Sequence, residues 1–281
     1  MQAKLKKIII QGDDLGYSPV SDSGIKYAYE HGILTSTTVM ANLLKRSDKK
    51  KYREYVNKLE NKSGLEKPEL GIGVHLNVTY GKPLSSKWPQ KEFTRPFRNS
   101  GKPEEWQGSV WRKYFSQFTE RQVEDEYRTQ IEFALEFFGK IDHLDSHHFT
   151  ASYAPLTLIY EKMAKQYNLP VRPSAPLSEN PVYGGDFLVD NNFVNNMKKK
   201  KIKVADKYIL DLFFNEADPI KMFLGSLSNV YVGETCEIMF HPAKGEIAEE
   251  WRLKDLETLT NSKVISYFKV NNIELINYSL L

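Results

Sequence analysis

The sequence predicts an α/β fold with a mostly parallel sheet, built as one domain with two loop insertions. Short apolar runs alternate along the chain with amphipathic segments of helical period, which is typical of βαβ units. The chain has 281 residues, a normal length for a single α/β barrel. Because no internal repeat or low-complexity linker divides it, residues 1–281 are expected to form a single domain.

The expected strands are short runs of apolar and β-branched residues, and the expected helices repeat apolar residues three and four positions apart. The strands cover Ile8–Ile10, Thr35–Ala41, Leu70–Leu76, Ile141–Leu144, a short strand at Val171, Cys236–Phe240 and Ile273–Ile276. The helices cover Ser21–His31, Tyr52–Leu59, Val123–Phe138, Leu156–Tyr167, Leu253–Leu259 and Val264–Val270. Thr79–Pro103 and Ser174–Asn195 are the two irregular insertions, and loops of such length are often functional.

The composition argues against a nucleic-acid-binding or membrane protein and favours an intracellular one. Lys and Arg number 39 and Asp and Glu 36, and this net charge of +3 is too small to indicate a nucleic-acid partner. The run Lys198–Lys201 is expected to be a solvated helix end or loop. Cys236 is the single cysteine, which favours a reducing compartment and a buried thiol. With no signal-peptide core or membrane span near the start, we expect a cytoplasmic protein without a membrane partner. The sequence is compatible with a homodimer but does not fix the oligomeric state.

Polar residues follow the ends of the expected strands. This set comprises Asp13, Asp14, His75, Asp145, His147, His148 and His241. Taken singly, an Asp pair often caps a helix and a lone histidine is usually a hydrogen-bonded core residue. However, the carboxyl ends of parallel strands open on one face, where α/β enzymes place their chemistry. We therefore expect one functional site there, with His143 on the far side of its strand as a structural residue.

These residue types point to metal-assisted hydrolysis. One carboxylate and two imidazoles form a three-ligand metal site with open positions for water and substrate. A divalent metal acidifies its water and polarises a carbonyl, while a second carboxylate takes a proton and a histidine protonates a leaving amine. Two imidazoles suit zinc, cobalt, nickel or manganese better than magnesium. We keep both magnesium and zinc as candidates for the single divalent ion.

Six segments, in order along nearly the whole chain, resemble the motifs of the YdjC-like (ChbG-type) carbohydrate deacetylases. They are Ile8–Ser18, Gly32–Asn42, Gly73–Asn77, His143–His148, Leu169–Arg172 and Glu237–Pro242. The resemblance implies a modified (β/α) barrel, one divalent metal and removal of the N-acetyl group from N-acetylglucosamine-containing, chitin-type oligosaccharides. Carried over by position, the implied metal ligands are Asp14, His75 and His147. Asp13 corresponds to the general base, and His241 and Arg172 to further active-site groups.

Other residues are expected to contact the substrate. His241 is expected to protonate the departing amine or to hold the water, and Arg172 and His148 to bind the sugar. Tyr80 and Trp88, in the first insertion, either stack on sugar rings or pack their loop onto the barrel.

Two departures from the family pattern leave the exact sugar open. Phe149 stands where the family commonly has another histidine, and Ala243 where it often has glycine. The ligand His147 is intact, so activity is expected.

Two other functions compete with the deacetylase. The first is a different metal-dependent hydrolase on the same barrel, cleaving a phosphoester or a cyclic amide. A phosphatase would need a basic clamp, for which Arg172 is the obvious candidate. The second is a non-catalytic sugar-binding protein, against which the intact Asp13 argues because binding alone needs no base.

Overall fold

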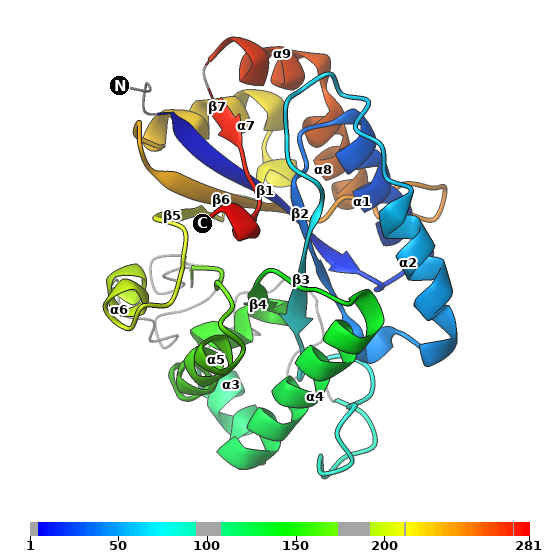
Figure 1. Ribbon diagram of the computed structural model, residues 1–281, viewed down its shortest axis with the longest axis vertical. Helices are drawn as coiled ribbons and strands as arrows, with labels where there is room; N and C mark the ends of the chain where they lie inside the picture. The colour runs from blue at the N-terminus through cyan, green and yellow to red at the C-terminus, as the bar shows by residue number, and fades with distance from the viewer. Residues whose placement is uncertain (1–4, 94–107, 174–191, 211, 272) are drawn as a thin grey trace.

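The computed structural model describes residues 5–93, 108–173, 192–210, 212–271 and 273–281 (Figure 1). Its strands are β1 Lys6–Leu15, β2 Ser36–Val39, β3 Gly71–Leu76, β4 Leu144–Ser146, β5 Lys207–Ile209, β6 Thr235–Phe240 and β7 Ile273–Leu275. Its α-helices are α1 Pro19–His31, α2 Lys49–Asn57, α3 Gly108–Phe115, α4 Glu120–Phe138, α5 Ala154–Tyr167, α6 Phe193–Lys199, α7 Pro219–Ser226, α8 Glu250–Thr260 and α9 Ser262–Val270. Of the two expected insertions, residues 94–103 and 174–191 lie outside the described residues.

The sheet is parallel and curled, with strand order β4-β3-β2-β1-β6-β5 and β7 paired to the start of β1. Two isolated parallel bridges join Leu144 to Val171 and Val171 to Val204, which precedes β5 by three residues. These bridges connect the two edges of the sheet, so it curls toward a barrel. The helices lie around its outside (Figure 1). The expected α/β class and mostly parallel barrel are confirmed.

Alternation along the strands separates an outer apolar face from the barrel interior. On β1, Ile8 and Ile10 belong to the main hydrophobic core, whereas Ile9 packs with Ile276 and Tyr278 in a second cluster. On β6, Cys236 and its alternate neighbours pack in the main core, as expected for a buried thiol. The residues between them face inward, and toward the carboxyl ends of the strands this interior is polar.

Several strand boundaries in the structure differ from those expected from the sequence. β1 continues through Leu15, so Asp13 and Asp14 lie within the strand rather than after it. β4 begins at Leu144, where pairing with Val74 starts, and it includes the polar Asp145. Val171 forms only isolated bridges.

The sequence patterns missed β5, α3, α6 and α7. α6 begins at Phe193, inside the expected second insertion, and the lysine run ends it as expected. The start of α7 does have a sequence signal: Asp218 is an N-cap that accepts a hydrogen bond from the backbone N–H of Lys221, and Pro219 follows it. Among the described residues, no helix has both the length and the apolar character needed to cross a membrane.

Candidate metal centre

A β-bulge brings two consecutive carboxylates into the same site. Successive side chains of a regular strand point to opposite faces, so Asp13 and Asp14 would be separated. Pairing between β1 and β2 joins Gly12 to Thr37 and then Leu15 to Val39, leaving two residues on β1 opposite one on β2. Asp14 has a φ of 75°, in the left-handed region. The extra residue turns the strand so that both carboxylates reach the polar interior.

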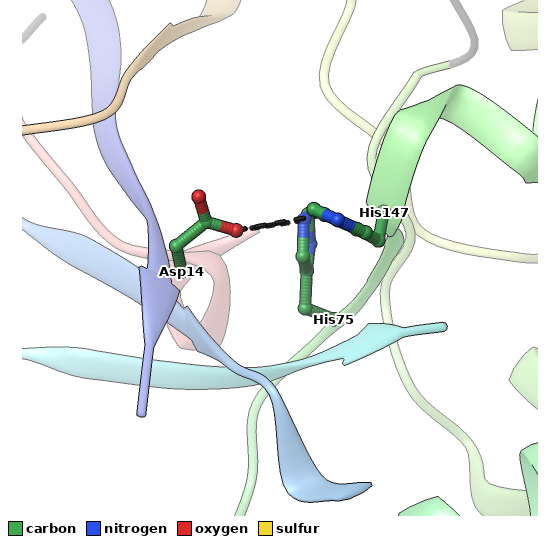
Figure 2. A group of neighbouring side chains, drawn as sticks. All are labelled: Asp14, His75 and His147. Atoms are coloured by element: carbon green, nitrogen blue, oxygen red, sulfur yellow. Dashed lines mark ion pairs between the residues drawn. The ribbon is translucent and has the colours of Figure 1, made fainter. Parts of the chain in front are cut away.

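Asp14, His75 and His147 converge from β1, β3 and the turn after β4 (Figure 2). Asp14 Oδ1 lies 3.6 Å from His75 Nε2 and 3.5 Å from His147 Nδ1. These separations are long for hydrogen bonds. They are close to the separation of about 3.3 Å between neighbouring tetrahedral ligands whose bonds to zinc are about 2.0–2.1 Å. The structure thus brings the three expected ligands together.

An unpartnered oxygen within this cluster fits a divalent cation. Asp14 Oδ1, which lies nearest to His75 Nε2 and His147 Nδ1, is buried and has no hydrogen-bond partner. A buried polar atom without a partner costs free energy, and a bound cation would remove that cost here. Burial and the neighbouring His148 hold the pKa of His147 well below its ordinary value, which leaves the ring neutral, as a metal ligand must be. The donor set of one carboxylate and two imidazoles suits such an ion.

Asp145 fixes the orientation of His75. The Nδ1–H of His75 donates to Asp145 Oδ1 at 2.5 Å, and Thr38 Oγ1 donates to Asp145 Oδ2 at 2.9 Å. Burial alone would lower the pKa of His75, but the Asp145 carboxylate, with Asp13 and Asp14, raises it to about 9. Asp145 keeps the proton on Nδ1 and turns Nε2 toward Asp14, and a cation bound there would displace the second proton from Nε2.

Arg252, on α8, holds the other oxygen of Asp14. Its Nη2 donates to Asp14 Oδ2 at 2.8 Å and its Nε donates to Glu249 Oε2 at 3.0 Å. The rings of Trp251 and Tyr17 lie 4.4 and 5.3 Å from its guanidinium carbon. Burial would raise the pKa of Asp14, but Arg252 and the histidines lower it far below its ordinary value. Asp14 is therefore ionised and oriented.

Arg172 is enclosed by carboxylates. Its Nη2 and Nη1 donate to Asp13 Oδ1 at 2.6 Å and Oδ2 at 2.8 Å, and its Nε donates to Glu237 Oε1 at 2.6 Å. Nη1 also lies 3.0 Å from Asp145 Oδ2. Burial would raise the pKa of Asp13, but Arg172 lowers it to about 2. Arg172 is buried, and its N–H groups point at the carboxylates of Asp13, Asp145 and Glu237. The structure therefore places it behind Asp13 rather than facing a sugar or a phosphate.

His241 places its Nε2 3.9 Å from Asp13 Oδ2, the oxygen that also accepts from Arg172 Nη1. Its backbone N–H donates to Asp255 Oδ2 at 2.7 Å, which joins the loop after β6 to α8. Burial lowers the pKa of His241, although Asp14 and Asp13 oppose this, so the ring is neutral near pH 7. A neutral imidazole beside an ionised carboxylate can receive and pass on a proton.

With this geometry in place, comparison with known proteins identifies the family. A family model described as YdjC-like protein matches residues 7–269. The chain belongs to the YdjC-like family. It is 30% identical over 284 residues to a carbohydrate deacetylase of Clostridium beijerinckii, covering 97% of this chain and 98% of that one. It is 27% identical over 276 residues to a chitooligosaccharide deacetylase of Proteus mirabilis, covering 92% and 91%.

The fold is also that of a solved structure. A protein from Enterococcus faecalis V583, provisionally described as a cellobiose-phosphate cleavage protein, superposes with a TM-score of 0.74. The two chains are 23% identical, and the match covers 98% of each. The YdjC-like chain therefore shares one architecture with this protein along its length.

Two other residues of this YdjC-like chain that were expected to contact the substrate, Tyr80 and His148, lie close to the ring of His147. Tyr80 is half-buried, with its ring 6.3 Å from that of His147, and the His148 ring lies 3.8 Å from the His147 ring, tilted by 34°. His148 lies outside the ligand cluster, and its Nδ1 is 2.9 Å from Thr79 Oγ1.

Trp88 is not placed for sugar stacking. It is 5% exposed and packs against Phe93 and Phe118 at ring separations of 5.0 and 4.4 Å. An indole ring enclosed by other aromatics has no free face, so Trp88 anchors its loop to the core. His143 is likewise structural, since it is buried and stacks on Tyr278.

Three residues of the site had no assigned role in the sequence analysis. Glu237 carried a usable signal, because a charged residue within an apolar strand must be paired when it is buried. Asp145 was noted at a strand end without a role. Arg252 has no local signal, since its spacing from Glu249 resembles an ordinary surface pair on a helix.

Proposed function

We propose that this protein is a metal-dependent carbohydrate deacetylase that removes the N-acetyl group from N-acetylglucosamine-containing, chitin-type oligosaccharides. The observation that carries the proposal is the buried cluster of Asp14, His75 and His147 with a second carboxylate, Asp13, one residue away. Membership of the YdjC-like family, whose named relatives are carbohydrate deacetylases, supports the same reaction.

In this proposal, Asp14, His75 and His147 hold one divalent ion. When bound, the ion polarises the acetyl carbonyl, stabilises the negative charge that develops on its oxygen and acidifies water. Asp145 and Arg252 fix the orientation of two of the ligands. Two imidazoles favour zinc over magnesium on chemical grounds, and metal analysis decides between them.

Asp13 is the proposed general base. Its carboxylate is ionised, and Arg172 holds both of its oxygens in place. Each carboxylate oxygen has two lone pairs, so accepting from Arg172 leaves capacity for a water proton. The water oxygen forms a bond to the acetyl carbon as its proton passes to Asp13.

His241 completes the proton transfer. Its ring is neutral and faces Asp13 Oδ2, so it receives the proton and delivers it to the amine nitrogen as the carbon–nitrogen bond breaks. The products are acetate and a sugar with a free amino group, and one water molecule is consumed. Each such proton transfer contributes about 10²–10⁴-fold to the rate.

The test is acetate release from N-acetylglucosamine oligomers by the purified protein, with metal analysis of the same sample. Acetate and free amine are expected in equal amounts, and a chelator should abolish both until zinc or magnesium is restored. Phosphate release from a phosphoester, or opening of a cyclic amide, without any acetate would overturn the proposal in favour of another hydrolase. Sugar binding without turnover would indicate a non-catalytic protein.

A further inference from the structure

Two buried polar residues lie in the barrel interior behind the site, and the reaction proposed above does not use them. Glu237, on β6, and Tyr278, in the 3-10 turn η8 (Tyr278–Leu280) near the chain end, both have no exposed surface. The hydroxyl of Tyr278 donates to Glu237 Oε2. The other oxygen of Glu237, Oε1, accepts from Arg172 Nε at 2.6 Å.

These contacts form a continuous path to the proposed base. A guanidinium is planar and presents its N–H donors in a fixed fork. Glu237 occupies the Nε edge of Arg172, which sets the plane in which Nη1 and Nη2 meet the two oxygens of Asp13. The orientation of Asp13 therefore depends on the orientation of Glu237.

The hydroxyl of Tyr278 can be separated from the packing of its ring. The ring stacks on His143 with centroids 4.0 Å apart and planes 10° from parallel. The neighbouring chain is fixed independently, since Asn277 Nδ2 donates to the Glu69 carbonyl at 2.9 Å and Ile276 N to the Ile8 carbonyl at 3.0 Å. A phenylalanine at position 278 would keep these contacts and remove only the donor to Glu237.

We propose that Glu237 and Tyr278 are positioning residues for the deacetylation: Tyr278 holds Glu237, Glu237 holds Arg172, and Arg172 aligns Asp13 with the attacking water. The inference rests on the proposed function, in which Asp13 receives the water proton. A buried carboxylate that loses a donor must rotate or find another partner, because an unsatisfied acceptor is costly. Removing the Tyr278 hydroxyl therefore disturbs Arg172 without touching the metal ligands.

The kinetic test compares Tyr278→Phe, Glu237→Gln and Glu237→Leu in the metal-loaded full chain. Tyr278→Phe should lower kcat about tenfold, while KM and bound metal stay within twofold of wild type. Glu237→Leu should lower kcat about 10²-fold or more. Glu237→Gln keeps an oxygen acceptor for Arg172 Nε and should recover most of that loss. Tyr29→Phe is the matched control, because Tyr29 is also buried and its hydroxyl donates to the carbonyl of Pro68, away from Arg172 and Asp13.

A double-mutant cycle separates positioning from a general effect on folding. If Tyr278 acts through Asp13, then Tyr278→Phe has no further effect on kcat in an Asp13→Asn background. An equal loss in both backgrounds, or a Tyr278→Phe kcat within twofold of wild type, would overturn the inference.

A measurement without substrate keeps this inference distinct from the proposed function. Side-chain NMR of protein labelled with ¹⁵N-arginine reports the Arg172 Nε–H directly. Its resonance should exchange slowly with solvent in the wild type, and it should shift and exchange faster in Tyr278→Phe but not in Tyr29→Phe. If no acetylated sugar is hydrolysed but this change is seen, the positioning network stands and the proposed function fails. An unchanged resonance in Tyr278→Phe overturns the network whatever the activity.

Discussion

Asp13 and Arg172 form a buried bidentate ion pair, with Arg172 Nη2 2.6 Å from Asp13 Oδ1 and Nη1 2.8 Å from Oδ2. The neighbouring Asp14 has a different environment, since one of its oxygens faces two imidazoles and the other accepts from Arg252. The bulge in β1 lets consecutive residues meet these different partners. Two adjacent carboxylates can therefore have separate roles, and this separation can be tested.

Asp13→Asn should lower kcat on N-acetylglucosamine oligomers by about 10²–10⁴-fold while bound metal stays nearly unchanged. The amide cannot take the water proton, and it presents only one oxygen to Arg172. Steady-state kinetics with metal analysis of the same preparation checks both parts. Near-wild-type turnover on every sugar that the parent protein hydrolyses would contradict the role of Asp13 as base.

Asp14→Asn should instead lose the metal. The substitution removes the negative charge that would face the cation and places an amide against Arg252. Equilibrium dialysis against zinc or magnesium, followed by elemental analysis, should show at least tenfold weaker binding than in Asp13→Asn. If both variants lose metal equally, the two carboxylates share the ion and the division between them is wrong.

Much of the fold was predictable because its apolar patterns are regular. The β-branched run at Ile8–Ile10 and the helical pattern of Val123–Phe138 both correspond to real elements. The end of β1 was not predictable in this way, since Asp13 and Asp14 near its end are polar. They remain in the strand because the barrel interior contains their charged partners, Arg172 for Asp13 and Arg252 for Asp14. The spacing of apolar residues therefore predicts which residues of such a strand face the outer core, but it does not predict where the strand ends.

The site was predictable only in part for a related reason. Asp14, His75 and His147 occur at strand ends, where the parallel sheet brings polar residues together. Arg252 reaches Asp14 from α8, 238 positions later in the chain, through packing that no local pattern records. Trp88 illustrates the opposite error, because an aromatic residue in a loop has the same sequence signal whether it binds a sugar or packs the loop.

Trp88→Ala should destabilise the protein and leave catalysis of the folded enzyme nearly unchanged. The ring is buried between Phe93 and Phe118, so its removal leaves a cavity that costs about 3–5 kcal/mol. Urea unfolding measures the stability, and KM is measured well below the unfolding transition. A several-fold rise in KM with unchanged stability would restore the sugar-stacking role for Trp88.

His241→Ala should lower kcat by about 10²-fold or more and flatten the acidic limb of the pH–rate profile. Burial lowers the pKa of His241 below 6.5, so the wild-type ring is neutral at pH 7 and becomes protonated as the pH falls. A protonated ring cannot receive the proton from Asp13, so activity should fall on that side. His31→Ala, at the end of α1, is the control. An acidic limb that survives in His241→Ala would assign it to another group.

Asp255, which accepts a hydrogen bond from the backbone N–H of His241, links pH to stability because its carboxyl is buried. Burial raises the pKa of Asp255 to about 7, although the His241 amide and Arg252 oppose this. The unfolded chain has an aspartate pKa of about 3.9, so the folded state binds this proton more tightly. The resulting stabilisation is complete below pH 4 and is lost as the pH rises through 7.

Asp255→Asn should therefore become more stable relative to wild type as the pH increases from 5 to 8. The asparagine keeps an oxygen for the His241 N–H and removes the cost of ionising a buried carboxyl. The difference in free energy of unfolding should change by an amount on the order of 2–4 kcal/mol across this range. Urea titrations at pH 5, 6, 7 and 8 measure it, and Asp218→Asn, at the exposed N-cap of α7, provides the background. If the difference in free energy of unfolding does not vary with pH, Asp255 is already ionised in the folded protein at pH 5. Arg252 and the His241 amide would then stabilise the carboxylate by more than its burial costs.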